Sequence, residues 1–205
     1  CVLFSFFTWW RSRHEVQAQK LLRQQAQLAS LRYQLNPHFL FNSLNTISAF
    51  VYQSPEKADA IVHALADILR YALDTADQAT VPLRQELDII GKYIDIEKAR
   101  FSDRLRYCLH VEEAALDRPV PTLFLQPLVE NSIKHNATRP SLTITIDISL
   151  QNDRLHIKVK DDGVGFPSKL KGKGLGLKNT QQRVEASQGT FKAYNDPGAT
   201  IDIWM

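Results

Sequence analysis

The spacing of the apolar residues changes near residue 104, and this change constrains the fold more than any other feature of the chain. Before it, over residues 14–101, apolar residues recur at the three- and four-residue spacing of helices. After it, they alternate with polar residues, which is typical of half-buried strands. The alternating runs are 105–111, 142–150, 155–159, 190–194 and 199–204. The sequence therefore predicts a helical first half and a second half built on a β-sheet.

Two helices of the first half have recognisable beginnings. Ser54 is a favoured N-cap, and Pro55 after it is tolerated in a first turn. Apolar residues then recur at helical spacing, namely Ala58, Ile61, Leu65, Ile68 and Ala72. A third helix is expected after Pro82, with one apolar stripe of Leu83, Leu87, Ile90 and Ile94.

The second half also contains helical patterns, at 127–137 and 175–188, which interrupt the strands. Turns are expected at Asn152-Asp153 and at residues 195–198. The expected fold class is α+β: a helical region, then a two-layer α/β sandwich with its helices on one face of the sheet.

The chain opens on the apolar run CVLFSFFTWW, followed by Arg11 and Arg13. Interfacial aromatic residues followed by positive charge are expected where a helix leaves a membrane. A membrane span needs about 20 residues, so we expect residues 1–10 to be the end of a transmembrane helix. A signal-peptide core and a buried segment are the alternatives. Residues 11–35, with leucines at 21, 28 and 35, fit a juxtamembrane signalling helix or short coiled coil.

Charge and cysteine content exclude some partners. A net charge of +3, from 25 basic and 22 acidic residues, is nearly balanced, so we expect no direct binding of nucleic acid. Cys1 and Cys108 lack neighbours at metal-ligand spacing and are too few for a disulfide framework.

One stretch of the second half, LQPLVENSIKH at 125–135, has the residue types of a phosphate site. On a helix, Asn131, Lys134 and His135 share one face. An amide oxygen there suits a hard cation, and an ammonium group suits a phosphate.

Two glycine-rich stretches follow it along the chain. In DDGVGF, at 161–166, the glycines Gly163 and Gly165 allow the backbone to approach a planar ligand, and Asp161 can accept a hydrogen bond from an exocyclic amine. GKGLGL, at 172–177, leads into a helix whose N-terminus offers N–H groups to phosphates. Each stretch alone is a common tight loop, whereas the three in this order predict a nucleotide site.

On these motifs the second half resembles the ATP-binding domain of histidine kinases, the GHKL or Bergerat fold shared with gyrase, the ninety-kilodalton heat-shock chaperones and MutL. NPHFLFNSLN, EKARFSDRL and LQPLVENSIKH resemble the LytS/YehU-type family of membrane sensor histidine kinases. The resemblance runs from about Gln34 to the end. It implies a helical dimerisation and phosphotransfer region over 36–103 and an ATP-binding domain over 104–205.

The resemblance also implies roles for single residues. His38 would be the phosphoacceptor, and Asn42 stands at the spacing of a residue used to dephosphorylate the partner regulator. Asn131 would hold Mg²⁺. The other expected ATP contacts are Lys134 and His135 at the phosphates, Asp161 at adenine, Gly163 and Gly165 in the pocket wall, and Gly172, Gly174 and Gly176 at the base of the lid.

The implied activity is Mg²⁺-ATP-dependent autophosphorylation of His38, then transfer of the phosphoryl group to an aspartate of a response regulator. The implied regulator is of the LytTR type, the implied assembly is a homodimer, and the implied location is the bacterial inner membrane with residues 11–205 in the cytoplasm. Phe39 follows His38 where many histidine kinases carry a carboxylate. The group that orients the imidazole must therefore come from elsewhere, such as a third-helix carboxylate or a backbone carbonyl.

The residues around His38 support a helical face. If 38–50 is a helix, His38, Asn42 and Asn45 share one side of it. An apolar stripe on another side would comprise Leu40, Leu44, Ile47 and Val51. A partly buried structural histidine is the alternative for His38.

Two other functions stay open. One is a GHKL-type ATPase, although Pro127 stands where such enzymes carry their glutamate base, and Glu130, adjacent to Asn131 and so about 100° from it round the helix, is poorly placed as a substitute. The other is a non-catalytic membrane signalling scaffold, which labelling of His38 with phosphate would exclude.

Overall fold

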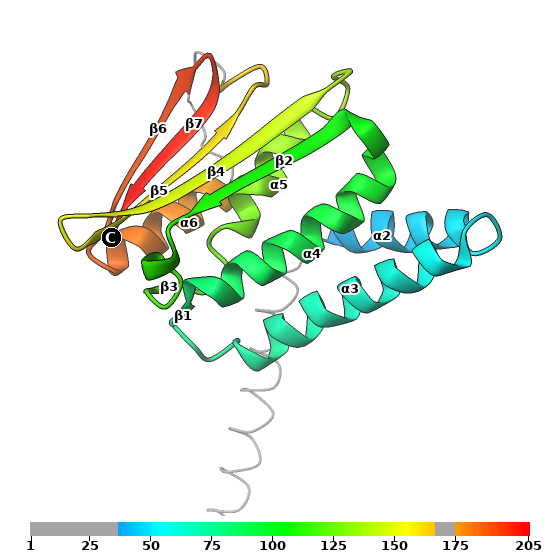
Figure 1. Ribbon diagram of the computed structural model, residues 1–205, viewed down its shortest axis with the longest axis horizontal. Helices are drawn as coiled ribbons and strands as arrows, with labels where there is room; N and C mark the ends of the chain where they lie inside the picture. The colour runs from blue at the N-terminus through cyan, green and yellow to red at the C-terminus, as the bar shows by residue number, and fades with distance from the viewer. Residues whose placement is uncertain (1–36, 167–174) are drawn as a thin grey trace, which may run out of the picture.

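The computed structural model describes residues 37–166 and 175–205 (Figure 1). The predictions for the membrane end at 1–10, for the helix at 11–35, and for Gly172 and Gly174 lie outside these residues. Within 37–166 and 175–205, no helix is long and apolar enough to cross a membrane.

The first layer of the fold is a five-stranded mixed sheet. Its order is β2 (Leu105–Val111), β4 (Leu142–Gln151), β5 (Arg154–Asp161), β7 (Gly198–Trp204) and β6 (Thr190–Asp196). β2 runs parallel to β4, and the other neighbours are antiparallel. Each strand expected from the alternating pattern is present, because every second residue faces the core: Ile144, Ile146, Ile157 and Ile203 are fully buried.

The turns between strands follow the expected chemistry. Asn152 and Asp153 both have positive φ, at 52° and 63°, as a tight two-residue hairpin requires. At the β6–β7 turn a Cβ on Gly198 would lie 2.0 Å from the carbonyl oxygen of Asp161, so only glycine fits there.

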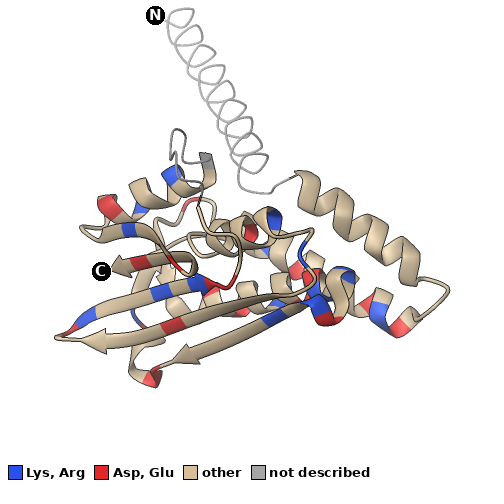
Figure 2. Cartoon of the chain, turned by 90° about the horizontal axis from the view of Figure 1, so that it is seen from above, with Lys and Arg blue, Asp and Glu red and all other residues tan. Residues whose placement is uncertain are grey.

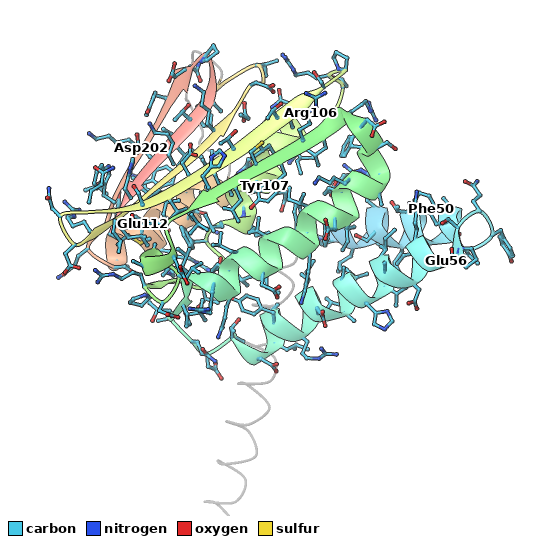
Figure 3. The ribbon with its side chains drawn as sticks, viewed as in Figure 1. Phe50, Glu56, Arg106, Tyr107, Glu112 and Asp202 are labelled. Carbon is cyan, nitrogen blue, oxygen red and sulfur yellow. The ribbon has the colours of Figure 1, made fainter. Side chains whose placement is uncertain are left out.

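The second layer consists of helices on one face of the sheet, as Figure 1 shows. α4 (Leu83–Phe101) packs against β2, α5 (Gln126–His135) against β4 and β5, and α6 (Leu175–Ala186) against β6. The opposite face carries polar pairs, such as His110 with Asp147 and His156 with Asp202. Figure 3 labels Asp202 of this face.

An α-helical hairpin completes the described chain. It consists of α2 (Pro37–Phe50) and α3 (Pro55–Asp74), and α3 packs on α4. Phe50 and Glu56 lie at its closed end, away from the sheet (Figure 3). The predicted stripe of α3 is confirmed, since Ala58, Ile61, Leu65, Ile68 and Ala72 are all buried. Ser54 occupies the N-cap position, but its side chain makes no capping bond.

A second, two-stranded sheet was not predicted. β1 (Thr80–Pro82) pairs antiparallel with β3 (Pro119–Pro121) and holds the start of α4 beside the segment that leads to α5. Both strands have three residues and carry prolines, so no alternating pattern signals them. The short 3₁₀ helices η1 (Ser102–Arg104) and η2 (Glu113–Ala115) flank β2. The buried apolar side chains form one cluster from Phe39 in α2 to Ile203 in β7.

Candidate nucleotide pocket and phosphoacceptor histidine

A pocket opens between α5, the end of β5 and the start of β7. Four predicted site residues line it: Asn131, His135, Asp161 and Gly165. Its apolar walls include Leu128, Val159 and Ile201. The asparagine helix and the glycine turn, which lie about 30 residues apart in the chain, therefore enclose one cavity, as a nucleotide site requires.

Asp161 is held rigidly at the floor of this pocket. It is 2 % exposed. Its Oδ1 accepts hydrogen bonds from the backbone N–H groups of Gly163 at 2.9 Å and Ala199 at 3.1 Å. Because these bonds use Oδ1, the second carboxylate oxygen is left to accept from an amine of a ligand.

The two glycines after Asp161 are required mainly by asparagine side chains. A Cβ on Gly163 would lie 2.2 Å from Oδ1 of the buried Asn136. Gly165 has a φ of +74°, and its Cβ would lie 2.8 Å from Oδ1 of Asn195. The expected reason, close approach to a planar ligand, is thus only part of the explanation.

Asn136 is a pocket residue that the sequence analysis missed. Its Oδ1 accepts from the N–H of Val164 at 2.9 Å, and its Nδ2 donates to the carbonyl of Ser132 at 2.8 Å. Asn195 holds Phe166 in a similar way, accepting from its N–H at 2.7 Å. Asn136 follows the predicted motif directly, and its position at a helix end was the one available signal.

The opposite end of the pocket has the groups for a phosphate chain. Nδ2 of Asn131 donates to the carbonyl of Pro127 at 2.6 Å, which leaves its amide oxygen for a cation. Gly176, in the first turn of α6, lies against this amide, and its Cβ would be 3.6 Å from Asn131 Nδ2. Lys134 and His135 are exposed in the last turn of α5, and of the two His135 lines the pocket. The donor set at Asn131 therefore fits Mg²⁺-ATP.

His38 lies in the first turn of α2 with an exposed side chain. Nδ2 of Asn42 lies 3.1 Å from its Nδ1 and 3.4 Å from its Nε2. The predicted pairing of these residues at i and i+4 is confirmed. α2 carries no charged residue along its whole length (Figure 2), so no carboxylate of α2 itself can act on the histidine.

The predicted apolar stripe of α2 is partly wrong. Leu40 and Ile47 pack against the core, but Leu44 and Val51 are exposed. The buried face is instead Phe39, Ser43 and Thr46. The hydroxyls of Ser43 and Thr46 can be buried there because they donate to the backbone carbonyls of Phe39 and Asn42.

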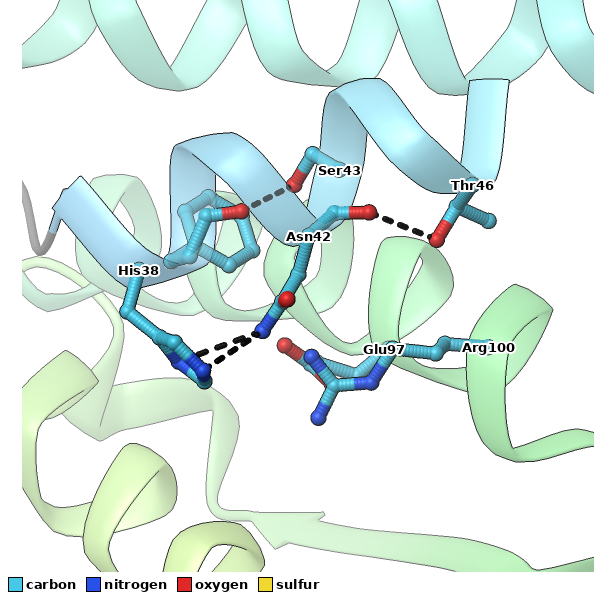
Figure 4. A network of polar contacts seen from close by, with 7 residues as sticks. His38, Asn42, Ser43, Thr46, Glu97 and Arg100 are labelled. Atoms are coloured by element: carbon cyan, nitrogen blue, oxygen red, sulfur yellow. Dashed lines mark hydrogen bonds and ion pairs between the residues drawn. The ribbon is translucent and has the colours of Figure 1, made fainter. Parts of the chain in front are cut away.

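The last turns of α4 bring charged groups to the histidine. Glu97 and Arg100 point toward the side chains of His38 and Asn42 (Figure 4). Glu97 is 3 % exposed, and Arg100 Nη2 lies 3.1 Å from its Oε2. Burial raises the pKa of Glu97 to about 6; the Arg100 charge opposes this and the Glu130 charge of α5 adds to it. α4 also packs on α5, whose Asn131 lines the pocket.

A second buried carboxylate of α4, Glu86, fixes the start of α5. Its oxygens accept from the backbone N–H groups of residues 123, 124 and 125, at 2.6, 3.2 and 3.4 Å. The hydroxyl of Tyr71 in α3 donates to it at 2.7 Å. Burial raises the pKa of Glu86 although these four donors oppose it. The helical hairpin and the pocket helix thus share one buried anchor.

The chain matches two protein families over most of its length. Residues 26–105 match the family described as "Histidine kinase". Residues 117–205 match the family described as "Histidine kinase-, DNA gyrase B-, and HSP90-like ATPase". This second match covers the pocket helix and the strands β4 to β7 of the sheet, so an ATP-binding domain is established for this part of the chain.

Several curated relatives are sensor proteins. Sensor protein LytS of Enterococcus faecalis is 34% identical over 198 residues, which are 88% of this chain and 34% of that protein. Sensor protein kinase HptS of Staphylococcus aureus is 37% identical over 155 residues, 76% of this chain and 30% of that protein. The chain thus spans about a third of the length of these relatives.

The solved structures agree on the fold. The histidine kinase domain of a blue-light activated histidine kinase from Erythrobacter litoralis superposes with a TM-score of 0.53 at 16% identity, covering 91% of this chain and 94% of that one. A bacterial phosphotransferase gives a TM-score of 0.57 at 10% identity, covering 88% and 96%. With both halves matched in order and LytS proteins aligned across them, the chain belongs to the LytS-type sensor histidine kinases.

Proposed function

We propose that this chain transfers the γ-phosphoryl group of Mg²⁺-ATP to His38 and then to an aspartate of a response regulator. The observation that carries the proposal is the position of His38. It lies on α2, where Glu97 of α4 points toward it, and α4 also packs on α5, whose Asn131 lines the nucleotide pocket. The donor and acceptor groups are therefore carried by helices that pack on one shared helix.

Different pocket residues would bind the adenine, the metal ion and the phosphates of ATP. Asp161 would accept from the exocyclic amine of adenine, with Gly163 and Gly165 forming the wall. Asn131 would hold Mg²⁺, which, when bound, balances the charge of the phosphates. Lys134 and His135 would meet the phosphates. The base of the lid would comprise Gly172, Gly174 and Gly176.

The reaction needs a nucleophile and a leaving group in line. A ring nitrogen of His38 uses its lone pair to form the bond to phosphorus, while the bond from phosphorus to the bridging oxygen breaks and ADP leaves with that electron pair. Positioning of the two reactants supplies most of the acceleration.

The exposed apolar face of α2 supports a homodimer. Phe41 is 69% and Leu44 55% exposed on a helix without charge, and such a face is covered when a second copy packs on it. We further propose anchoring of the whole protein in the bacterial inner membrane by helices at its N-terminus, with residues 11–205 in the cytoplasm. The proposed partner is a response regulator of the LytTR type.

The test is labelling of the purified chain with ATP that carries a radioactive γ-phosphate. We expect an acid-labile, base-stable label on the parent protein and none on His38→Gln. His63→Gln, which changes an exposed histidine of α3, is the matched control and should label at the parental rate. Release of phosphate without phosphoprotein would favour the ATPase alternative, and absence of both would favour the scaffold.

Asn42 is proposed to act in a separate, opposing reaction, hydrolysis of the phosphoaspartate of the regulator to aspartate and inorganic phosphate. Its amide lies beside His38, where a phosphoaspartate would dock, and an amide can position an attacking water. We expect Asn42→Ala to slow dephosphorylation of a purified phosphoregulator about 10-fold. A parental rate would remove Asn42 from this role.

A further inference from the structure

The histidine site contains a buried carboxylate with one unsatisfied oxygen. Among residues 37–166 and 175–205, Glu97 Oε2 has no hydrogen-bond partner. Arg100 Nη2 lies 3.1 Å away, so the two charges attract, but the contact lacks the geometry of a hydrogen bond. A buried carboxylate oxygen that accepts no hydrogen bond is costly, and such groups occur where a function requires them.

Packing between α2 and α4 aims this carboxylate at the histidine. The rings of Phe39 and Tyr93 pack with their centroids 4.7 Å apart. Glu97 follows Tyr93 by one turn of α4, and Asn42 follows Phe39 by nearly one turn of α2. The side chains of Glu97 and Asn42 consequently point toward one another on the side where His38 lies (Figure 4).

We propose that Glu97 is a positioning residue for His38: its carboxylate holds the Asn42 amide against the imidazole and stabilises the positive charge that the ring gains during phosphoryl transfer. This inference rests on the proposed kinase function. It also supplies, from α4, the orienting group that α2 lacks.

Charge balance explains why a carboxylate is needed there. When the ring nitrogen of His38 bonds to phosphorus and ADP departs, the proton on the other ring nitrogen stays, so the ring becomes a cation. A negative charge nearby stabilises that cation more than it stabilises the neutral ring of the ground state. The asparagine amide, with two N–H groups and one carbonyl, can contact the ring and the carboxylate together.

The other groups facing Glu97 set its charge. Burial beside Tyr93 raises the pKa of Glu97 to about 6, with Arg100 of the same helix lowering it and Glu130 of α5 raising it. At neutral pH the carboxyl group is thus mostly ionised, in a place where water is excluded, which strengthens its effect on the ring.

The experiment compares Glu97→Gln with Asp95→Asn. Both remove one negative charge from α4, but Asp95 is exposed. For Glu97→Gln we expect kcat of autophosphorylation to fall about 10- to 100-fold, with KM for ATP unchanged, and parental kinetics for Asp95→Asn. In protein with ¹⁵N-labelled imidazoles, the ring signals of His38 should shift in Glu97→Gln alone.

The outcomes separate this inference from the kinase function. If the parent does not label, the proposed function fails. If the parent labels and Glu97→Gln matches its rate, or loses rate while the His38 signals stay parental, Glu97 is not a positioning residue. Should Glu97→Gln not fold, Glu97→Asp is measured in the same way. His38 ring signals close to the parental ones, together with partial activity, support the role. Parental kinetics contradict it when the ring signals are displaced.

Discussion

The two ends of α4 hold buried glutamates with opposite environments. Glu86, in the first turn, accepts four hydrogen bonds, from Tyr71 and from three backbone N–H groups before α5. Glu97, in the last turns, is as deeply buried, at 3 % against 2 % exposure, but its Oε2 accepts none from the described residues. Both carboxyl groups have pKa values raised chiefly by burial.

This difference distinguishes a carboxylate that stabilises the fold, Glu86, from one that positions and stabilises the histidine, Glu97. A carboxylate whose acceptor sites are filled by backbone donors stabilises the fold, since the donors it satisfies would otherwise be buried without partners. One that keeps an oxygen unsatisfied costs stability and is retained for its effect on a neighbour. The helix thus ties the pocket helix down at one end and serves the histidine at the other.

The variant with the largest expected effect is Glu86→Ala, which tests whether Glu86 stabilises the fold. It leaves the buried N–H groups of residues 123–125 and the hydroxyl of Tyr71 without their acceptor, so we expect the free energy of unfolding to fall by about 4 kcal/mol. Urea denaturation followed by circular dichroism measures it. ATP affinity should fall as well, because the start of α5 loses its anchor.

Tyr71→Phe is the graded control for that variant. It removes one of the four hydrogen bonds and leaves the carboxylate on its three backbone donors, so a loss of about 2 kcal/mol is expected. If Glu86→Ala cost no more than Tyr71→Phe, the backbone bonds would contribute little and Glu86 would not be the anchor of α5.

The arrangement of helices and strands could be predicted from the sequence, because burial on one face imposes a period of two or of 3.6 residues. The pocket residues Asn131, Asp161 and Gly165 and the pairing of His38 with Asn42 could also be predicted, since each depends on local spacing. The domain boundary between residues 103 and 104 stays a prediction: α4, which ends just before it, packs on both α3 and β2.

A third-helix carboxylate is one of the groups expected to orient His38, but the burial of the two glutamates, and which of them faces the histidine, could not be predicted. In the sequence, Glu86 and Glu97 lie among the charged residues between the stripe positions of α4, and such residues usually face solvent. Their burial comes from β1–β3 pairing and from α2, both distant in sequence. Likewise, Asn136 acquires its role only when the end of α5 meets the turn after β5. Ser43 and Thr46 become buried because α2 packs on α3 and α4.

A smaller effect is expected at Glu97, in the last turns of α4, as a dependence of stability on pH. The pKa of Glu97 is raised from 4.5 to about 6 in the folded protein, so the fold prefers its protonated form. Its contribution to stability is greatest below pH 4.5 and is lost as the pH rises through 6. Between pH 4.5 and pH 7.5 the parent should therefore lose about 2 kcal/mol of unfolding free energy that Glu97→Gln, which does not titrate, retains.

The measurement is urea denaturation of both proteins at several pH values, with Asp95→Asn again as the control, whose difference from the parent should stay nearly constant. A Glu97→Gln protein that gains on the parent as the pH rises, while its autophosphorylation falls, is the expected signature of a carboxylate retained for catalysis at the expense of stability. A Glu97→Gln protein whose difference from the parent is the same at every pH would show that the fold does not disfavour the ionised form of Glu97, and the stability cost assigned to it would be wrong.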